Sequence, residues 1–238
     1  MLTLTQLILI LLVILWAVVL FGGFLLGHPT PTNPQRIPRP TRMGASLVLV
    51  IFAWGWWLLG AEGDLRPLAL WVAVGMTLGF LGDLFMARLI VHDDRYVFGG
   101  IGAFSLGHMA YIIGMLGYSR AAGLEMRADA LLLWEVAAVI GWVVVVLWGN
   151  RPTPLHVAAL VYAMLLAGTA GIATGLALQD RAFVPVAVGA ALFLFSDLVL
   201  AGQLFGRVRF AGGNDLVWLT YSPGQMLIVA GLALPVLL

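Results

Sequence analysis

The sequence contains no cysteine and no lysine, and it has few charged residues of either sign. Without cysteine, the chain can form no disulfide, no CxxC redox centre and no thiolate metal site, so any reactive group must be a carboxyl, imidazole, hydroxyl or amide. Charged residues make up 10% of the 238 residues, and the net charge is +1. So weak a positive field excludes nucleic acids as partners.

Apolar residues, in contrast, are in excess. They make up 62% of the chain, and the mean hydropathy is +1.05, far above the values of ordinary globular proteins. A lipid bilayer is the only solvent that accommodates such a composition. We therefore predict an integral membrane protein, with the bilayer as its principal partner.

Eight apolar blocks divide the sequence, each close to the length of about 20 residues that a spanning helix needs. They cover approximately Leu4–Leu26, Met43–Gly60, Leu65–Ala87, Val97–Tyr118, Ala130–Trp148, Leu155–Leu178, Phe183–Leu204 and Leu216–Leu238. The blocks lack the alternation of a membrane β-barrel, and a backbone in lipid must satisfy its own hydrogen bonds. We predict an all-α, polytopic membrane protein with eight transmembrane helices in a single domain over residues 1–238.

The longest connection, residues 27–42, holds five of the eleven prolines and three arginines, which predicts an extended polar loop. The connections after the first, third, fifth and seventh blocks carry eight arginines, and the other connections carry four. Positively charged loops remain in the cytoplasm, so this count predicts that both termini lie outside. The first block lacks a basic start and is longer than a signal-peptide core, so we expect it to be retained.

The third and seventh blocks share a motif. Gly82–Ala87 reads GDLFMA and Ser196–Ala201 reads SDLVLA, which places Asp83 and Asp197 114 residues apart. Four helices separate the copies, so both run in the same membrane direction. This spacing predicts a duplicated four-helix unit related by an axis along the membrane normal, although chance likeness between two apolar helices is the alternative.

Asp83 and Asp197 are the main candidates for chemistry. An aspartate at depth in a bilayer costs on the order of 2.5 to 3.5 kcal/mol, so it usually has a partner or a function. Other polar side chains fall in the same half of the bilayer and come from several helices, and we expect them to bind a substrate in a cavity with apolar walls. These are Ser105, His108, Tyr111, Tyr162, Ser196, Tyr221 and Gln225.

Each of these residues also has a purely structural interpretation. An aspartate near a helix end can be interfacial, His108 can be a satisfied buried histidine, and polar side chains often join neighbouring helices. Two aspartates and His108 could also bind a divalent ion. No HExxH motif and no second deep histidine accompany them, so we predict no metal and no organic cofactor.

Five segments of the sequence resemble the YhhN family of integral membrane proteins. They are Gly82-Asp83, Phe98–Tyr111, Val161–Ala163, Phe195–Leu198 and Tyr221–Ile228. The resemblance covers the chain from the second block onward. Members of that family usually carry Lys-Pro where Arg39-Pro40 stands here, and an arginine can also serve a lipid phosphate.

The resemblance implies an enzyme, because the YhhN family includes lysoplasmalogenases. These ether hydrolases cleave the vinyl ether bond of a lysoplasmalogen to a fatty aldehyde and glycerophosphoethanolamine or glycerophosphocholine. It also implies a bacterial inner-membrane location and a lysophospholipid or related lipid as substrate. The reaction needs one acid and one anion, and we expect Asp83 and Asp197 to fill these roles, with the assignment left open.

The phosphate of the substrate is expected at the mouth of the cavity, on Arg39, Arg95 or Arg209. Two other classes of function remain open. Paired intramembrane acids in a parallel repeat also suit a proton-coupled transporter of lipids or small molecules, and the chain could be a non-catalytic lipid-binding protein. Release of aldehyde from a lysoplasmalogen separates the hydrolase from both.

Overall fold

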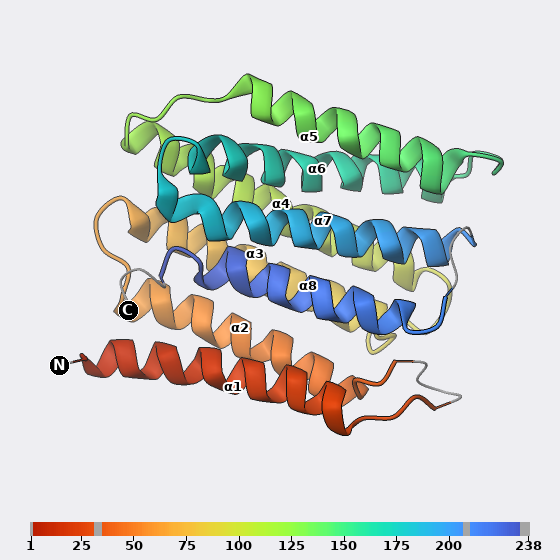
Figure 1. The fold of residues 1–238 in the computed structure, drawn as a ribbon, viewed down its shortest axis with the longest axis horizontal. Coiled ribbons are helices and arrows are strands. Elements are labelled where there is room, and N and C mark those ends of the chain that lie inside the picture. Colours follow the sequence, from red (N-terminus) through yellow and green to blue (C-terminus); the bar gives the residue numbers. More distant parts are fainter. Residues whose placement is uncertain (1, 31–34, 207–209, 234–238) are drawn as a thin grey trace.

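A computed structural model describes residues 2–30, 35–206 and 210–233, and every element within them is a helix (Figure 1). The α-helices are α1 (Leu4–Leu26), α2 (Arg39–Leu59), α3 (Leu65–Met86), α4 (Tyr96–Ala121), α5 (Ala128–Gly141), α6 (Pro154–Ala177), α7 (Val184–Leu204) and α8 (Gly213–Ala230). A π-helical segment η1 (Trp142–Leu147) continues α5, and a 3₁₀ turn η2 (Arg181–Phe183) precedes α7. The prediction of an all-α fold with eight helices is confirmed.

Seven helices, α1 to α7 with their short extensions, are long and apolar enough to cross a membrane. The eighth, α8, has 18 residues, contains the polar residues Asn214, Asp215 and Gln225, and is not among these seven. It nevertheless lies within the bundle, beside α7, α3 and α2 (Figure 1). The chain is therefore a polytopic membrane protein, while its orientation and the identity of the membrane stay predictions.

Most of the helix boundaries lie within three residues of those predicted. The prediction was wrong for α2, which begins at Arg39 rather than Met43. Its first turn contains Pro40, which suits that position because a first-turn residue has no intrahelical hydrogen bond to donate. It was also wrong for α8, which begins at Gly213 and ends at Ala230, and residues 234–238 of the predicted block lie outside the described residues. The polar loop after α1 therefore ends at residue 38, and Arg42 belongs to a helix.

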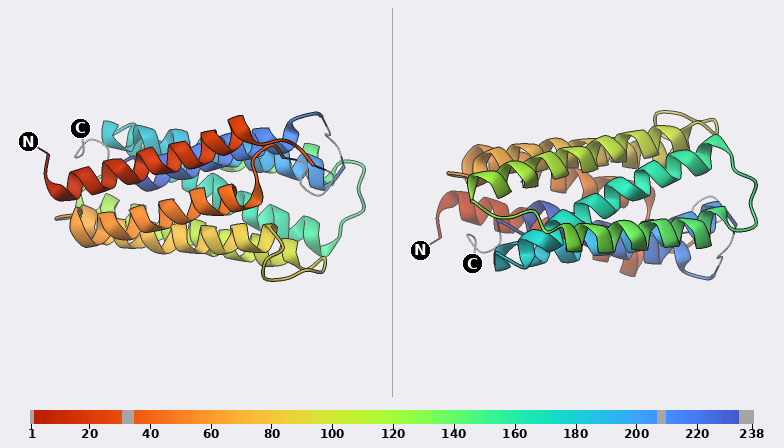
Figure 2. Two further views of the ribbon diagram at one scale, coloured as in Figure 1. Left: turned by 90° about the horizontal axis from the view of Figure 1, so that it is seen from below. Right: turned by 90° about the horizontal axis from the view of Figure 1, so that it is seen from above.

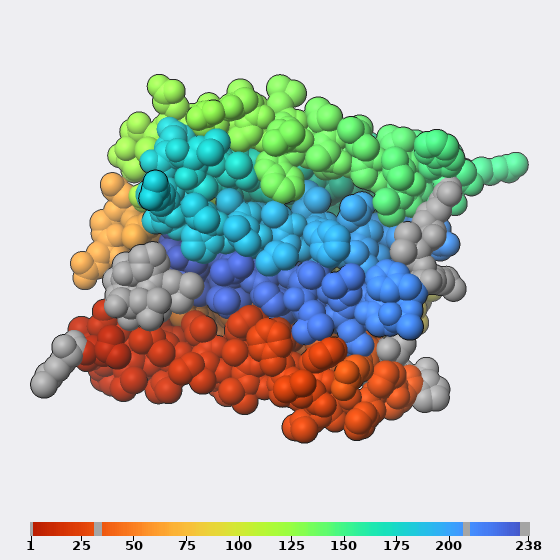
Figure 3. Space-filling view, in the orientation of Figure 1, coloured from red at the N-terminus to blue at the C-terminus, as the bar shows by residue number. Residues whose placement is uncertain are grey.

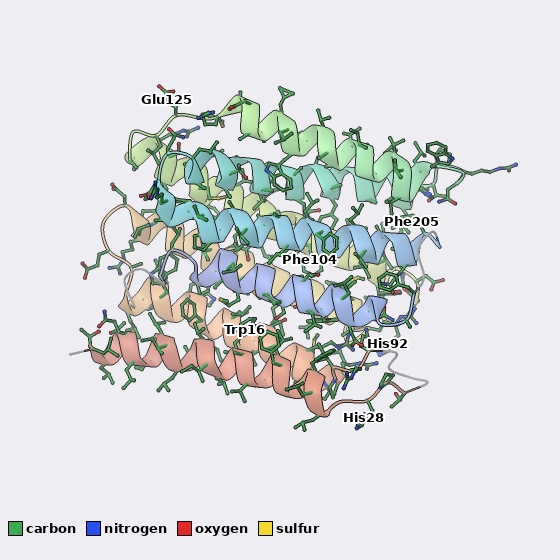
Figure 4. All side chains as sticks on the ribbon, in the orientation of Figure 1. Trp16, His28, His92, Phe104, Glu125 and Phe205 are labelled. Carbon is green, nitrogen blue, oxygen red and sulfur yellow. The ribbon has the colours of Figure 1, made fainter. Side chains whose placement is uncertain are left out.

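The helices run up and down, so their connections gather at two ends of the bundle (Figure 1). The connections after α1, α3, α5 and α7 lie at one end, which we call the long-loop end because it includes the chain between α1 and α2. His28, His92 and Phe205 lie at this end, Glu125 lies at the other, and Phe104 is in the interior (Figure 4). Both Asp83 and Asp197 are in the long-loop half of their helices.

Two helices, α1 and α5, are the outermost members, and α5, α7, α8 and α1 lie side by side on one face (Figure 3). Their outward side chains are exposed hydrocarbon, such as Leu11 and Val18 on α1 and Leu132, Leu133 and Ile140 on α5. Exposed leucine, isoleucine and valine would be unfavourable in water but suit contact with lipid chains. α5 and α6 lie close at one end and diverge toward the long-loop end (Figure 2).

The helix contacts repeat between the two halves of the chain. α3 packs most extensively on α4, and α7 packs most extensively on α8. The α1–α2 and α2–α3 contacts correspond to those of α5 with α6 and α6 with α7, and the α4–α6 contact corresponds to that of α8 with α2. These contacts map onto one another when each helix is exchanged for the one four places away, which supports the predicted duplication.

A hydrogen bond also joins equivalent positions of the two halves. Tyr111 Oη donates to Gln225 Oε1 at 3.0 Å, and these residues are 114 positions apart, the offset of the two aspartate motifs. Gly75 and Gly189 are separated by the same offset, and each lies against the neighbouring helix of its pair. Equivalent residues that touch each other must lie near the axis that relates the halves, so Tyr111 and Gln225 mark its position.

Replacing Gly189 with alanine should destabilise the bundle. A Cβ atom there would lie 2.6 Å from the carbonyl oxygen of Gly224, so α7 and α8 would have to separate. We expect a loss of about 1 to 3 kcal/mol of stability, measured as a lower unfolding temperature in detergent. Gly102→Ala is the matched control, because nothing lies within 4 Å of that position and alanine favours a helix. Equal unfolding temperatures for the two variants would contradict the predicted close approach.

Candidate active site

A cavity of about 130 Å³ lies between α4, α5 with η1, α6 and α7. Its walls are almost entirely hydrocarbon, from residues such as Ile101, Ala138, Leu166 and Leu194. The lining residues that carry polar side-chain groups are Asp197, Tyr162 and Trp142. Hydrocarbon walls around a few polar groups are typical of a site for an apolar ligand with one reactive or recognised group.

The π-helical segment of α5 shapes this cavity. η1 supplies two of the lining residues, Trp142 and Val146. Its hydrogen bonds span five residues rather than four, as in the bond from Trp148 N–H to Val143 O at 2.8 Å. Such segments are rare and often occur at functional sites. Here it widens α5 where that helix diverges from α6.

Asp197 carries the reactive chemistry of the cavity. The Tyr162 hydroxyl donates a short hydrogen bond to Asp197 Oδ2, and Ser196 Oγ lies 3.4 Å from Asp197 Oδ1. Ser196 is itself buried and donates to Phe193 O at 2.7 Å, which fixes its hydroxyl. The carboxyl therefore meets hydroxyl groups on one side and the cavity on the other, which suits a group that gives a proton to a ligand and takes it back.

The side chain of Asp83 is more completely buried than that of Asp197, and it does not line the cavity. It is 3% exposed, with the side chains of Ser46, Tyr221 and Arg42 as its neighbours. Within the described residues, Asp83 Oδ2 and Tyr221 Oη are buried without a hydrogen-bond partner. Unsatisfied buried polar atoms are uncommon and often mark functional positions.

Phe104 contacts the tyrosines that neighbour the two carboxyls, Tyr162 beside Asp197 and Tyr221 beside Asp83. Its ring lines the cavity, and a Cβ atom on Gly82 would lie 2.7 Å from it on the side of α3. The ring packs on Tyr162 and Tyr221 with centroid distances of 6.3 and 6.0 Å. Asp83 and Asp197 remain within electrostatic range of each other. The structure thus brings both aspartates to one region, but only Asp197 into the cavity.

The remaining predicted residues lie around this aromatic cluster. His108 is buried, with its ring 4.7 Å from that of Phe193, and its Nδ1 is 2.9 Å from Thr169 Oγ1. Tyr111 and Gln225 bind each other, so their side chains are occupied within the protein. Ser105 is half-buried on α4 and does not line the cavity.

Three residues that contact or neighbour the predicted site residues were not predicted from the sequence. Arg42 was assigned to a loop, but it is 7% exposed on α2, with its Cζ 5.1 Å from the centre of the Trp218 ring and with Asp83 and Asp215 in electrostatic range. Ser46 lies one turn further along α2, beside Asp83. Thr169, on α6, is the partner of His108. Only the spacing of Arg42 and Ser46, i and i+4, could have indicated that they share a helix face.

Of the three arginines predicted to bind a phosphate, the two that the structure describes, Arg39 and Arg95, do not line the cavity. Arg95 forms an exposed salt bridge with Asp93 at 2.5 Å, and hydrogen bonds from Arg95 hold the pKa of the Asp93 carboxyl below its usual range. Arg39 is exposed at the start of α2, which does not contribute to the cavity lining. Arg209 lies outside the described residues.

Comparison with protein families decides the identity of the chain. The sequence model of the YhhN family matches residues 39–232, from the first residue of α2 to just beyond α8. The chain belongs to the YhhN family. The matched region of this YhhN protein includes both aspartates and every residue of the cavity, while α1 precedes it. Neither the comparison with curated proteins nor that with solved structures found a match.

No metal site can be identified in the described part of this YhhN protein, since no three His, Cys, Asp or Glu side chains there are grouped closely enough to hold an ion. The chemistry available from the side chains themselves is proton transfer. Asp197 and Tyr162 supply acidic groups at the apolar cavity, and Asp83 supplies a third that is buried outside it.

Proposed function

We propose that this YhhN protein hydrolyses the vinyl ether bond of a lysoplasmalogen, to give a fatty aldehyde and glycerophosphoethanolamine or glycerophosphocholine. The observation that supports this most is a carboxyl, Asp197, at the wall of an otherwise apolar cavity inside a membrane bundle. A lipid with one long chain and one acid-labile bond matches that combination of surfaces.

The reaction begins when Asp197 gives its proton to the alkenyl carbon that is not bonded to oxygen. The double-bond electrons form the new C–H bond, and the neighbouring carbon becomes part of an oxocarbenium cation. Asp83 and the newly ionised Asp197 stabilise this cation, as paired carboxyls do in glycoside hydrolysis. Tyr162 holds the Asp197 carboxyl in position through its hydrogen bond.

Water then attacks the cation and yields a hemiacetal, and its surplus proton returns to Asp197. The hemiacetal breaks at its ether oxygen, and the glycerol oxygen takes the hydroxyl proton. One water is consumed, one aldehyde and one glycerophospho-alcohol are formed, and the enzyme returns to its starting state. No redox step occurs.

The direct test is aldehyde release by the purified protein in detergent, followed through NADH consumption by an added alcohol dehydrogenase. We expect aldehyde from an alkenyl lysophospholipid and none from the saturated alkyl analogue, because the analogue has no carbon that can accept the proton. Failure to release aldehyde from any alkenyl headgroup class would overturn the proposal.

Filling the cavity should block the reaction without unfolding the protein. Ala163 lines the cavity, so Ala163→Phe should raise KM for the lipid about tenfold or more, measured by aldehyde release. Val161→Phe is the matched control, because Val161 is two residues away on the same helix and is 56% exposed on its outer face. If both variants keep normal KM values, the lipid chain does not occupy this cavity.

A transporter is the second candidate, and the repeated helix contacts favour it, since many carriers are built from parallel repeats. A carrier of lysolipid would equilibrate its substrate across a vesicle membrane and release no aldehyde. Aldehyde release by protein in detergent, where no transport can occur, therefore decides between the two.

A further inference from the structure

His156 is buried near the start of α6, beside residues that line the cavity. It occupies the third position of α6 and is 7% exposed. On one face of α6, residues at i+3, i+7 and i+10 from His156 are Ala159, Ala163 and Leu166, and all three line the cavity. His156 therefore continues the cavity wall by one turn toward the long-loop end.

Two aromatic side chains of the cavity wall hold His156. The ring of Phe205 lies 4.8 Å from the imidazole ring, and the indole of Trp142 donates to the backbone oxygen of His156 at 2.9 Å. Both Phe205 and Trp142 line the cavity. Phe205 lies at the long-loop end in Figure 4. This is the end of the cavity that is nearest to the membrane surface.

The hydrogen bonds of the imidazole fix where its proton lies. The backbone N–H of Thr153 donates to His156 Nδ1 at 3.2 Å, and Thr153 Oγ1 lies 2.7 Å from the same atom. A nitrogen that accepts from a backbone N–H carries no proton, so Nε2 must carry the hydrogen of the ring. Nε2 is buried and has no partner among the described residues. A buried donor without an acceptor is costly, which indicates that a ligand supplies the acceptor.

The other half of the chain has a cation at the equivalent position. Arg42 precedes His156 by 114 residues, the offset of the repeat, and it too is buried one turn into its helix against an aromatic ring. In the first half, the residue at this position is Arg42, which lies in electrostatic range of the carboxyls of Asp83 and Asp215. In the second half no described residue supplies an acceptor to Nε2.

We propose that His156 Nε2 donates a hydrogen bond to a phosphate oxygen of the lipid whose chain fills the cavity. This assignment rests on the proposed function only in that it needs a phospholipid in the cavity. The N-terminus of α6 adds to the attraction, because the positive end of a helix dipole favours an anion. His156 then takes the role that the sequence suggested for Arg39 and Arg95, neither of which lines the cavity.

The test compares two non-cleavable ligands with the same saturated alkyl chain, an ether lysophosphatidylcholine and the alkylglycerol that lacks the phosphate group. Binding is measured by titration calorimetry in dodecyl maltoside, a detergent without phosphate. His156→Leu should raise Kd for the phospholipid about tenfold and leave Kd for the alkylglycerol within twofold. His156→Gln retains an N–H donor and should stay within threefold of the wild type for both ligands.

Exposed His92, at the same end of the bundle, provides the control variant His92→Leu, which should change neither Kd. An unchanged phospholipid affinity in His156→Leu, or an equal loss for both ligands, would overturn the proposal. A wild type that binds neither ligand would overturn it too. A His156-dependent preference for the phosphate without aldehyde release would instead leave it standing and refute only the hydrolase function.

Discussion

The Asp197→Asn variant is expected to lose vinyl ether hydrolysis by about 10³-fold or more, within the range that general acid catalysis contributes. Asparagine has nearly the same shape and can still accept the hydrogen bond from Tyr162, but it has no acidic proton to give to the alkenyl carbon. Because the residue lines a cavity rather than packing in the core, the fold should tolerate the change. The measurement is the rate of aldehyde release per amount of folded protein.

Two further variants define what this loss means. Tyr162→Phe removes only the hydrogen bond that orients the carboxyl, and we expect a smaller loss of roughly tenfold. Asp129→Asn removes an exposed carboxyl that pairs with Arg127 at the opposite end of the bundle, and its rate should be unchanged. If Asp197→Asn keeps more than a tenth of the wild-type rate, Asp197 is not the proton donor.

The Asp83→Asn variant should lose hydrolysis by about 10²-fold or more and should also unfold at a lower temperature. Asp83 supplies negative charge toward the reacting centre, and it is one of two carboxylates within range of the buried Arg42. Removing one member of a buried charge group leaves a cation that is less well compensated, which commonly costs about 3 to 5 kcal/mol. Aldehyde release and unfolding temperature are both measured.

A double variant separates the two effects. Asp83→Asn combined with Arg42→Gln removes both charges, so the unfolding temperature should recover while hydrolysis stays lost. Recovery of hydrolysis would show that Asp83 merely balances Arg42. Asp215→Asn is the matched control, because Asp215 is buried near the same arginine, has no part in the proposed reaction and accepts a hydrogen bond from the backbone N–H of Arg36.

The fold was largely predictable because hydrocarbon length dominates a membrane sequence. The bounds of α1 agree with the first apolar block, since no charged residue interrupts Leu4–Leu26 and its polar residues Thr5 and Gln6 fall in the first turn. The predicted helix boundaries were wrong where polar residues continue a helix. The segment Arg39-Pro40-Thr41-Arg42 has the composition of a loop, yet its side chains are placed by a helix whose inner face meets α3 and α8.

The candidate site was only partly predictable. Asp83 and Asp197 could be selected because charge is rare at that depth, but their surroundings depend on which helices touch. The contact of α4 with α6 brings Thr169 to His108, and no pattern within either helix encodes that contact. The cavity arises where α5 and η1 diverge from α6, and the divergence could not be seen in a uniformly apolar block.

The hydrogen bond between Tyr111 and Gln225 bears on how the two halves came to differ. In a dimer of identical four-helix chains, a side chain at the two-fold axis meets its own copy, so tyrosine would face tyrosine and glutamine would face glutamine. The hydrogen bond from the Tyr111 hydroxyl to the Gln225 amide requires two different residues at the axis. In one polypeptide the halves need not be self-complementary, so each can carry its own side chains, with Asp197 at an apolar cavity and Asp83 beside the buried Arg42.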